Sequence, residues 1–219
     1  MRLGEIDYNT AWAFQRELVR QRSAGNVGDT LLLLSHPHTY TLGRATKHGH
    51  ILVSPETLAA QGVAVIESDR GGDITYHGPG QIVSYPILKL SRHGGDVLGY
   101  LRMLEAVIIA TLASYGVTGT RVSGLTGVWV GDEKICAIGV KLSASGITHH
   151  GFALNVTTDL QYFRQIIPCG IAEKGVTSLE RLLGVAPLRA AVEAQIVQAF
   201  ARVFGVSIAF EESQGDVLH

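Results

Sequence analysis

The alternation of hydrophobic and polar residues predicts helices interleaved with groups of strands. Apolar residues recur at helical spacing over 7–25, 96–115 and 188–204, and shorter helices are predicted over 58–62, 159–167 and from Thr177 or Ser178 to Leu183. Strand-like runs cover 30–34, 39–41, 63–67, 74–76, 82–88, 127–130, 134–142, 148–157 and 206–210. Because there is no regular strand–helix–strand alternation and no internal repeat, the pattern favours one α+β domain with helices packed on mixed sheets. We place this domain at 1–210, followed by a polar tail at 211–219.

The stretch Arg70 to Leu90, RGGDITYHGPGQIVSYPILKL, stands out from this pattern. Its Gly71-Gly72 pair can adopt positive φ and lets a ligand or another backbone approach the main chain closely. Gly78-Pro79-Gly80 cannot continue a strand, so two extended pieces flank a polar elbow. Taken alone, this stretch also fits a β-hairpin with an elaborate turn.

Composition excludes several classes of function. The 219 residues carry a net charge of −1 and a pI near 6.7, with no basic stripe, so nucleic acid is not an expected partner. The sequence has neither a membrane-length apolar run nor a secretory signal, which indicates a cytoplasmic protein. Neither His36-x-His38 nor His149-His150 has helical metal-ligand spacing, so no metal is expected.

A cysteine and a lysine that lie far apart in the sequence are the candidates for catalysis. Cys169 lies between Pro168 and Gly170, in a segment without helix or strand pattern, where a thiol can meet a ligand. Its alternative role is that of a small buried hydrophobe. A reactive thiol needs a neighbouring cation, and Lys134, which begins an apolar strand, is the candidate. An exposed strand-end lysine is the alternative for Lys134.

Cys136 lies inside the same strand between Ile135 and Ala137, which favours a buried, inert thiol. The strand period of two nevertheless predicts Lys134 and Cys136 on one face. If Lys134 reaches Cys169, oxidation is expected to join the two cysteines.

Four motifs in order then carry a family resemblance. RGGDITYHGPGQIVSYPI, KICAIGVKL, HHGFALNV and PCGI with VTSL together resemble the lipoyl(octanoyl) transferases, or lipoate-protein ligase B family, over residues 70–179. The resemblance implies the α+β fold of the biotin and lipoate protein ligases, with a mixed sheet around an acyl pocket. One departure is Cys136, which occupies a position where the family carries a small, alanine-like residue.

The resemblance implies transfer of an octanoyl or lipoyl group through an acyl-cysteine intermediate. The donor is the phosphopantetheine thioester of acyl carrier protein, and no other cofactor is implied. The acceptors are lysines of the lipoyl domains of 2-oxoacid dehydrogenase complexes and of the glycine cleavage H protein. By motif, Cys169 forms the thioester and Lys134 is its partner, in a protein expected to be a monomer.

The same resemblance predicts the acyl-binding walls. They comprise Arg70, Gly71, Gly72, Asp73, Ile74, Thr75, Tyr76, His77, Ala137, Ile138, Gly139, Gly151, Phe152 and Ala153. Small residues are expected to leave room for the acyl chain, and Ile138 and Phe152 to cover it. His77 and His150 are given no catalytic role.

Two alternatives remain open at this point. One is an ATP-dependent lipoate or biotin protein ligase of the same fold, which would not need Cys169. The other is a non-catalytic module that holds acyl carrier protein or a lipoyl domain. Neither alternative accounts for Lys134 and Cys169 together.

Overall fold

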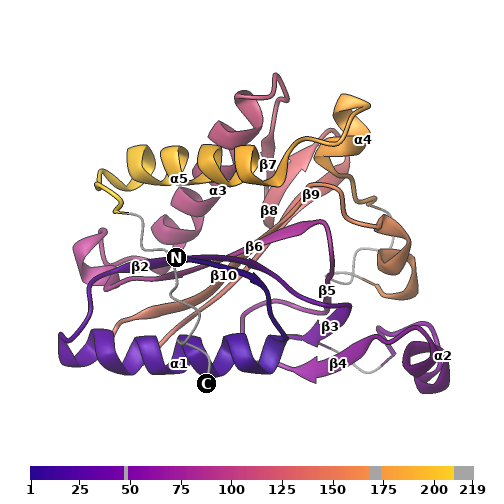
Figure 1. The fold of residues 1–219 in the computed structure, drawn as a ribbon, viewed down its shortest axis with the longest axis horizontal. Helices are drawn as coiled ribbons and strands as arrows, with labels where there is room; N and C mark the ends of the chain where they lie inside the picture. The colour runs from indigo at the N-terminus through magenta and orange to yellow at the C-terminus, as the bar shows by residue number, and fades with distance from the viewer. Residues whose placement is uncertain (47–48, 168–173, 210–219) are drawn as a thin grey trace.

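The computed structural model describes residues 1–46, 49–167 and 174–209 (Figure 1). In chain order its elements are β1 (Arg2–Glu5), α1 (Tyr8–Ala24), β2 (Thr30–Ser35), β3 (Thr39–Leu42), α2 (Pro55–Ala60), β4 (Ala64–Glu67), β5 (Thr75–His77), β6 (Gln81–Ile87), η1 (Leu90–Arg92), α3 (Val97–Ala113), β7 (Thr120–Val122), β8 (Leu125–Val130), β9 (Glu133–Leu142), β10 (Thr148–Asn155), η2 (Leu160–Gln165), α4 (Leu179–Leu183) and α5 (Arg189–Phe204).

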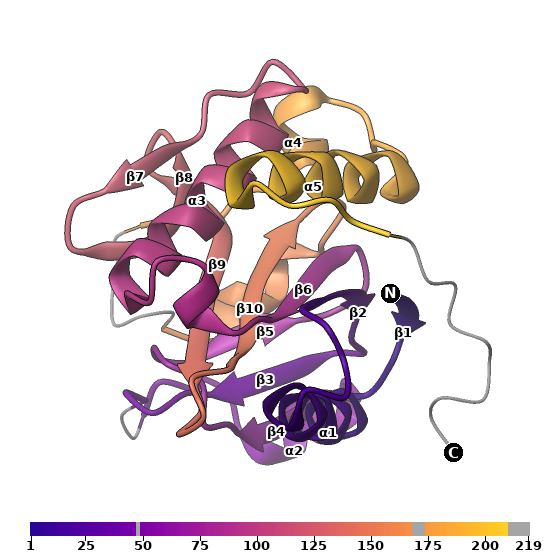
Figure 2. The same cartoon turned by 90° about the vertical axis from the view of Figure 1, so that its left-hand side faces the viewer.

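A seven-stranded sheet in the order β1-β2-β6-β10-β9-β8-β7 forms the centre of the molecule. The strand-like runs over 127–130, 134–142 and 148–157 form a meander, since β8, β9 and β10 are antiparallel neighbours. The edge strand β1 runs parallel to β2, so the sheet is mixed, as predicted. Helices α3 and α5 cover one face and α1 covers the other (Figures 1 and 2), which confirms the α+β architecture.

A smaller sheet, in the order β4-β3-β5, lies beside α1 (Figure 2). Strand β5 belongs to this sheet, whereas β6 lies inside the large one. The Gly78–Gly80 elbow therefore carries the chain from one sheet to the other, and the hairpin interpretation is wrong. Gly80 has φ of +79°, and a Cβ there would lie 2.6 Å from the backbone of Thr157, so the turn requires glycine.

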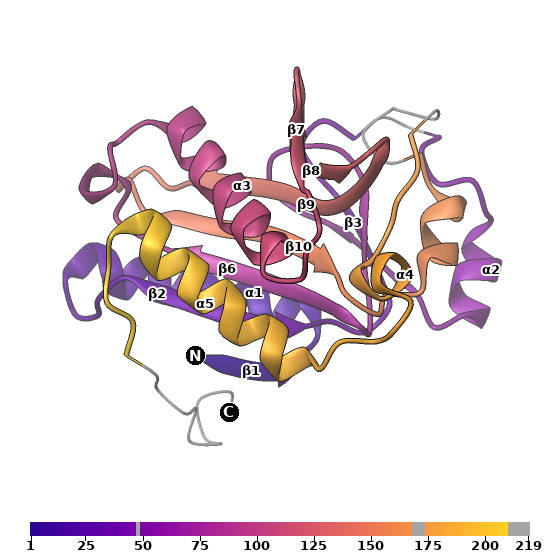
Figure 3. The same ribbon diagram turned by 90° about the horizontal axis from the view of Figure 1, so that it is seen from above.

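Capping residues set the ends of the long helices. The Asp7 carboxylate accepts a hydrogen bond from Thr10 N at the start of α1, and Gly25 ends that helix at φ 81°. Asp96 accepts from Leu98 N and Gly99 N at the start of α3. Because α3 lies diagonally across the strands (Figure 3), its apolar stripe packs on several of them at once.

Burial separates three apolar clusters. The largest lies between the central sheet and helices α3 and α5, and a second lies between the sheet and α1. The third fills the space between the small sheet, α2 and η2. Among the described residues, no helix combines the length and the apolar character that crossing a bilayer requires.

Some predicted elements differ from the structure. Strands β1 and β7 were missed because each is short and lies at a sheet edge. A strand predicted over 206–210 is wrong for residues 206–209, where Val206 N instead bonds Ala201 O behind the end of α5. The helix predicted over 159–167 is a 3-10 helix over Leu160–Gln165. The predicted tail at 211–219 lies outside the described residues.

Candidate active site

A cleft of about 790 Å³ opens where strands β8 and β9 part. Strand β8 pairs with β9 only from Glu133 to Cys136. Further along, the loop Arg70–Asp73 runs beside β9, and Gly71 N donates to Val140 O at 3.0 Å. The cleft therefore lies between this loop, the middle of β9 and β10, and the start of α3.

The structure brings nearly all predicted wall residues to this cleft. The lining includes Arg70, Gly71, Gly72, Asp73, Ile74, Thr75, His77, Ala137, Ile138, Gly139, Gly151, Phe152 and Ala153, together with Lys134. Residues from three separate motifs thus meet at one place, although they span more than eighty positions of the chain.

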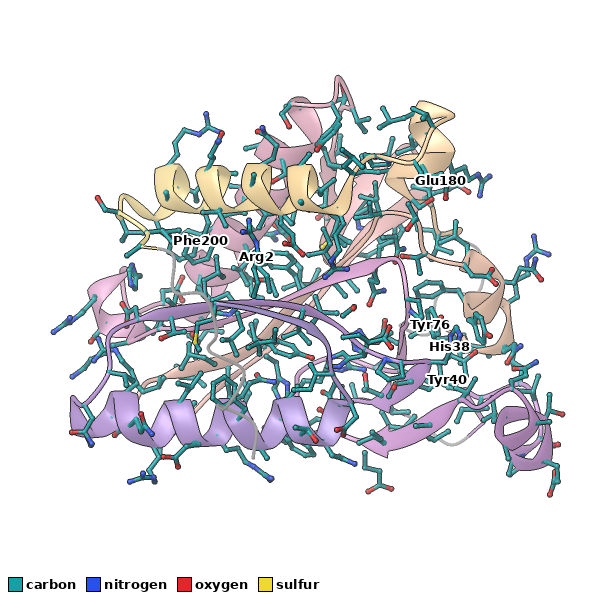
Figure 4. All side chains as sticks on the ribbon, viewed as in Figure 1. Arg2, His38, Tyr40, Tyr76, Glu180 and Phe200 are labelled. Carbon is teal, nitrogen blue, oxygen red and sulfur yellow. The ribbon has the colours of Figure 1, made fainter. Side chains whose placement is uncertain are left out.

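Tyr76 is the exception among the predicted wall residues. Alternation along β5 turns Thr75 and His77 toward the cleft and Tyr76 away from it. Its ring stacks on Tyr162 with centroids 4.9 Å apart, and its hydroxyl bonds His38 Nδ1 at 2.7 Å. Figure 4 shows Tyr76 beside His38 and Tyr40, so Tyr76 packs in the small-sheet cluster.

The buried Arg70 side chain holds the loop in place. Its Nε and Nη2 donate to Thr41 Oγ1 at 3.0 and 2.9 Å, and Nη2 also donates to Thr41 O at 2.6 Å. The loop carbonyls of Arg70 and Gly72 accept from Arg44 N and Ala45 N. The sequence predicted a loop that binds through its backbone, and these backbone groups dock it on its own chain.

The glycines of the floor have a packing role besides the one predicted. A Cβ on Gly139 would lie 2.7 Å from Gly71 O, and one on Gly151 would lie 2.1 Å from Ser84 O. These glycines therefore admit neighbouring backbone, in addition to lining the cleft. Space along the floor comes also from Ala137 and Ala153, which face each other across β9 and β10.

Lys134 lies at one end of the cleft, at the start of β9. Its Nζ lies 4.8 Å from the centroid of the Trp129 ring. Its backbone N donates to Gly175 O at 2.9 Å and its carbonyl accepts from Thr177 N at 3.0 Å. The residues that follow 168–173 therefore pair directly with Lys134. Cys169 itself lies outside the described residues.

Cys136 is buried, as predicted. It has no exposed surface and packs in the helix-side core, and burial raises the pKa of its thiol. The expected shared face with Lys134 is interrupted by a β-bulge, because β9 has one extra residue, Ile135, opposite Val128 and Trp129. Lys134 lines the cleft, whereas Cys136 contacts the core.

The end of the cleft around Arg70 holds uncharged imidazoles. Burial lowers the pKa of His36 to about 4 and that of His77 well below its usual value, and Arg70 adds to the effect on His77. His36 Nδ1 donates to Ile6 O at 2.7 Å, so its Nε2 accepts from the Tyr85 hydroxyl at 2.7 Å. His36 and His77 are therefore uncharged near neutral pH.

Asp69, His149 and His150 form the one described group of side chains with atoms close enough to share a metal ion. Asp69 already accepts from Lys141 Nζ and from His150 Nε2, and the His150 bond is the main cause of its lowered pKa. The ammonium of Lys141 already balances the charge of the Asp69 carboxylate, so we interpret this group as an ion-pair network.

Sequence reasoning missed several lining residues. Tyr8, Val83, Tyr85, Val97, Leu101 and Leu125 also face the cleft. The alternation of β6 carried a signal for Val83 and Tyr85, since both share a face of that strand. Val97 and Leu101 lie in the first turns of α3, and helical periodicity alone does not distinguish a side chain that lines a cleft from one that covers a sheet.

Comparisons with known proteins agree with this geometry. The model of the lipoyl protein ligase A/B catalytic domain family matches residues 7–201. An octanoyltransferase from Chloroflexus aggregans is 59% identical over 92% of each chain, and one from Chloroflexus aurantiacus is 57% identical over 93% of this chain and 92% of its own. A bipartite lipoate protein ligase from Thermoplasma acidophilum shares the fold, with a TM-score of 0.72 at 17% identity over 96% of this chain and 85% of its own.

Proposed function

The chain belongs to the lipoyl protein ligase A/B catalytic domain family, and we propose that it is an acyltransferase that moves an octanoyl group from an acyl carrier protein thioester to a lysine amine of a lipoyl domain. The octanoyltransferase relatives support octanoyl transfer in protein lipoylation, which confirms the resemblance carried by the four motifs. Lipoyl domains of 2-oxoacid dehydrogenase complexes and the glycine cleavage H protein are the acceptors we propose.

The observation that carries this proposal is Lys134 at the end of a cleft with apolar walls. Val83, on the same side of the sheet as Ala153, supplies an apolar surface for a hydrocarbon chain, and Ile138, Phe152 and Leu101 add apolar lining on the side of α3. Lys134 pairs with residues 175–177, which follow the segment containing Cys169 by only a few positions. This supports a Cys169 and Lys134 dyad with the acyl chain lying along the floor of Ala137 and Ala153.

The chemistry proceeds in two steps. Lys134 accepts the proton of the Cys169 thiol, and the thiolate attacks the thioester carbonyl, so that a C–S bond to the enzyme forms and the bond to the pantetheine sulfur breaks. The leaving pantetheine sulfur takes the proton back from Lys134. The acceptor amine then attacks the acyl-enzyme, the C–N bond forms, and the Cys169 thiolate leaves again. Lys134 accepts the proton that the amine loses. Exchange between thioesters is near balance and the amide product is more stable, so the reaction needs no ATP.

The test is the intact mass of the protein after mixing with octanoyl-acyl carrier protein. We expect one octanoyl group on the parent chain, none on Cys169→Ala, and slow loading or slow turnover on Lys134→Ala. A lipoyl domain should then remove the group as an amide. Consumption of ATP with free octanoate or lipoate, and no acyl-enzyme from the thioester, would instead identify an adenylating ligase.

A further inference from the structure

A hydrogen-bond network connects Lys134 to the other end of the cleft. It starts at the two bonds that join Lys134 to Gly175 and Thr177, which we call the Lys134 bridge. Thr177 is fully buried, and its carbonyl accepts from Asn155 Nδ2 at 3.1 Å. Asn155, the last residue of β10, thus holds the strand segment that pairs with Lys134.

Gln81 continues the network from Asn155. Gln81 Nε2 donates to Asn155 Oδ1 at 3.0 Å and to Tyr76 O at 3.2 Å. Because the amide nitrogen faces both of these acceptors, its Oε1 faces His77 Nδ1 at 2.9 Å. His77 therefore carries its proton on Nδ1 and accepts on Nε2.

Thr41 completes the network at the Arg70 loop. The Thr41 hydroxyl accepts from Arg70 Nε and Nη2, so its own proton is available to His77 Nε2 at 3.4 Å. Every donor direction thus follows from the permanently protonated guanidinium at one end and the backbone carbonyl of Thr177 at the other.

Burial makes this network rigid. Gln81, Asn155 and Thr177 are each at most 4% exposed, so water cannot substitute for a lost partner. Asn155 and Gln81 also line a cavity of about 20 Å³ together with Lys134, Ala137 and Ala153. The Asn155 amide therefore lies next to both the floor of the cleft and the lysine.

We propose that Asn155 is a positioning residue that holds the Lys134 bridge, and through it sets Lys134 for transfer. Asn155 acts through Thr177, so its loss should slow the chemical step while leaving the binding of the donor intact. This inference rests on the proposed function, and the experiment below separates failure of one from failure of the other.

The experiment measures single-turnover octanoyl loading from octanoyl-acyl carrier protein by intact mass. For Asn155→Ala we expect a loading rate at least tenfold below the parent, a KM for the donor within twofold, and faster amide exchange at Thr177. The matched control is Thr148→Val, at the other end of β10, which loses two buried hydrogen bonds, to Pro86 O and from Leu88 N. It should lower the Tm without slowing loading.

Asn155→Asp gives a second, pH-dependent measurement. The introduced carboxyl group donates to Thr177 O only when protonated, and it then still accepts from Gln81. The ratio of variant to parent loading rates should therefore rise several-fold from pH 8 to pH 6.

The outcomes separate the two proposals. A parent chain that never acquires octanoyl overturns the proposed function. If the parent chain loads, any one of three results for Asn155→Ala overturns the positioning role. The variant loads as fast as the parent, it loses only affinity for the donor, or it slows no more than Thr148→Val. If Asn155→Ala does not fold, a rate ratio for Asn155→Asp that is flat across this pH range overturns it instead.

Discussion

Replacing Thr41 with valine tests how much the Arg70 anchor contributes to the fold. The change keeps the shape of the side chain and removes the hydroxyl, which accepts two bonds from the guanidinium and lies 3.4 Å from His77 Nε2. Both Thr41 and Arg70 are buried, so water does not replace the lost partners. Thr41 O remains as an acceptor for Nη2 at 2.6 Å, so only part of the guanidinium bonding is lost.

The expected loss follows from these contacts. A hydrogen bond to a charged group contributes about 1.5–3 kcal/mol, and the neutral bond at His77 adds about 1 kcal/mol. Because Nη2 keeps Thr41 O as an acceptor, only the bond from Arg70 Nε counts as a fully lost charged hydrogen bond. Together with the bond at His77, its loss should reduce the free energy of unfolding of Thr41→Val by about 3 kcal/mol. The loop Arg70–Asp73 should also become less well held, which raises the KM for the octanoyl donor.

Thr39→Val is the matched control on the same strand. Thr39 is buried like Thr41, but its hydroxyl donates only to the nearby Pro37 O at 2.9 Å, so we expect a loss of about 1 kcal/mol. Urea denaturation of both variants with unchanged m-values gives the comparison. Equal losses for the two variants would refute the idea that the hydroxyl of Thr41 anchors a buried charge.

Protonation, the cleft floor and the buried thiol give three more expected outcomes. The folded pKa of His36 is about 4, below its unfolded value, so the unfolded state binds the proton first and stability falls as pH drops below about 6.5, by about 2 kcal/mol at pH 5. His36→Asn should reduce the difference in unfolding free energy between pH 7 and pH 5, measured by urea denaturation at each pH. An unchanged difference would contradict the assignment of this pH dependence to His36. Gly139→Ala should push the loop off β9, because its Cβ would lie 2.7 Å from Gly71 O, and should raise the donor KM at least tenfold in loading kinetics; an unaltered KM would argue against this packing. Cys136→Ala should cost about 1–2 kcal/mol in thermal unfolding and leave octanoyl loading unchanged, and a loss of loading would show that the thiol is not merely part of the core.

Local sequence patterns were sufficient for much of the fold. Apolar residues recurring over 96–115 predicted α3, because helical periodicity acts over a few residues. Local patterns do not predict which strands pair with each other. Strands β5 and β6 flank a tight turn, yet they pair in separate sheets, and a turn sequence contains no information about which distant strand takes each edge.

The residues of the candidate site were likewise predictable only in part. The ordered motifs placed nearly all of the predicted walls in one cleft, but motif membership alone did not distinguish Tyr76 from its neighbours on β5. Alternation along the strand would have done so. The tight packing at Gly139 could not be predicted, because it depends on Gly71, which is far away in the chain. Tyr8 was missed because it lies on α1, far in the chain from the other residues of the cleft.

The facing alanines on β9 and β10 have a practical consequence for redesign. Two methyl groups, Ala137 and Ala153, border the floor next to the lysine, while the adjoining glycines are fixed by backbone contacts. Engineers who want an enzyme that prefers shorter fatty acids should therefore enlarge one alanine at a time. Libraries that vary the glycines would instead displace the backbone segments that pack on them.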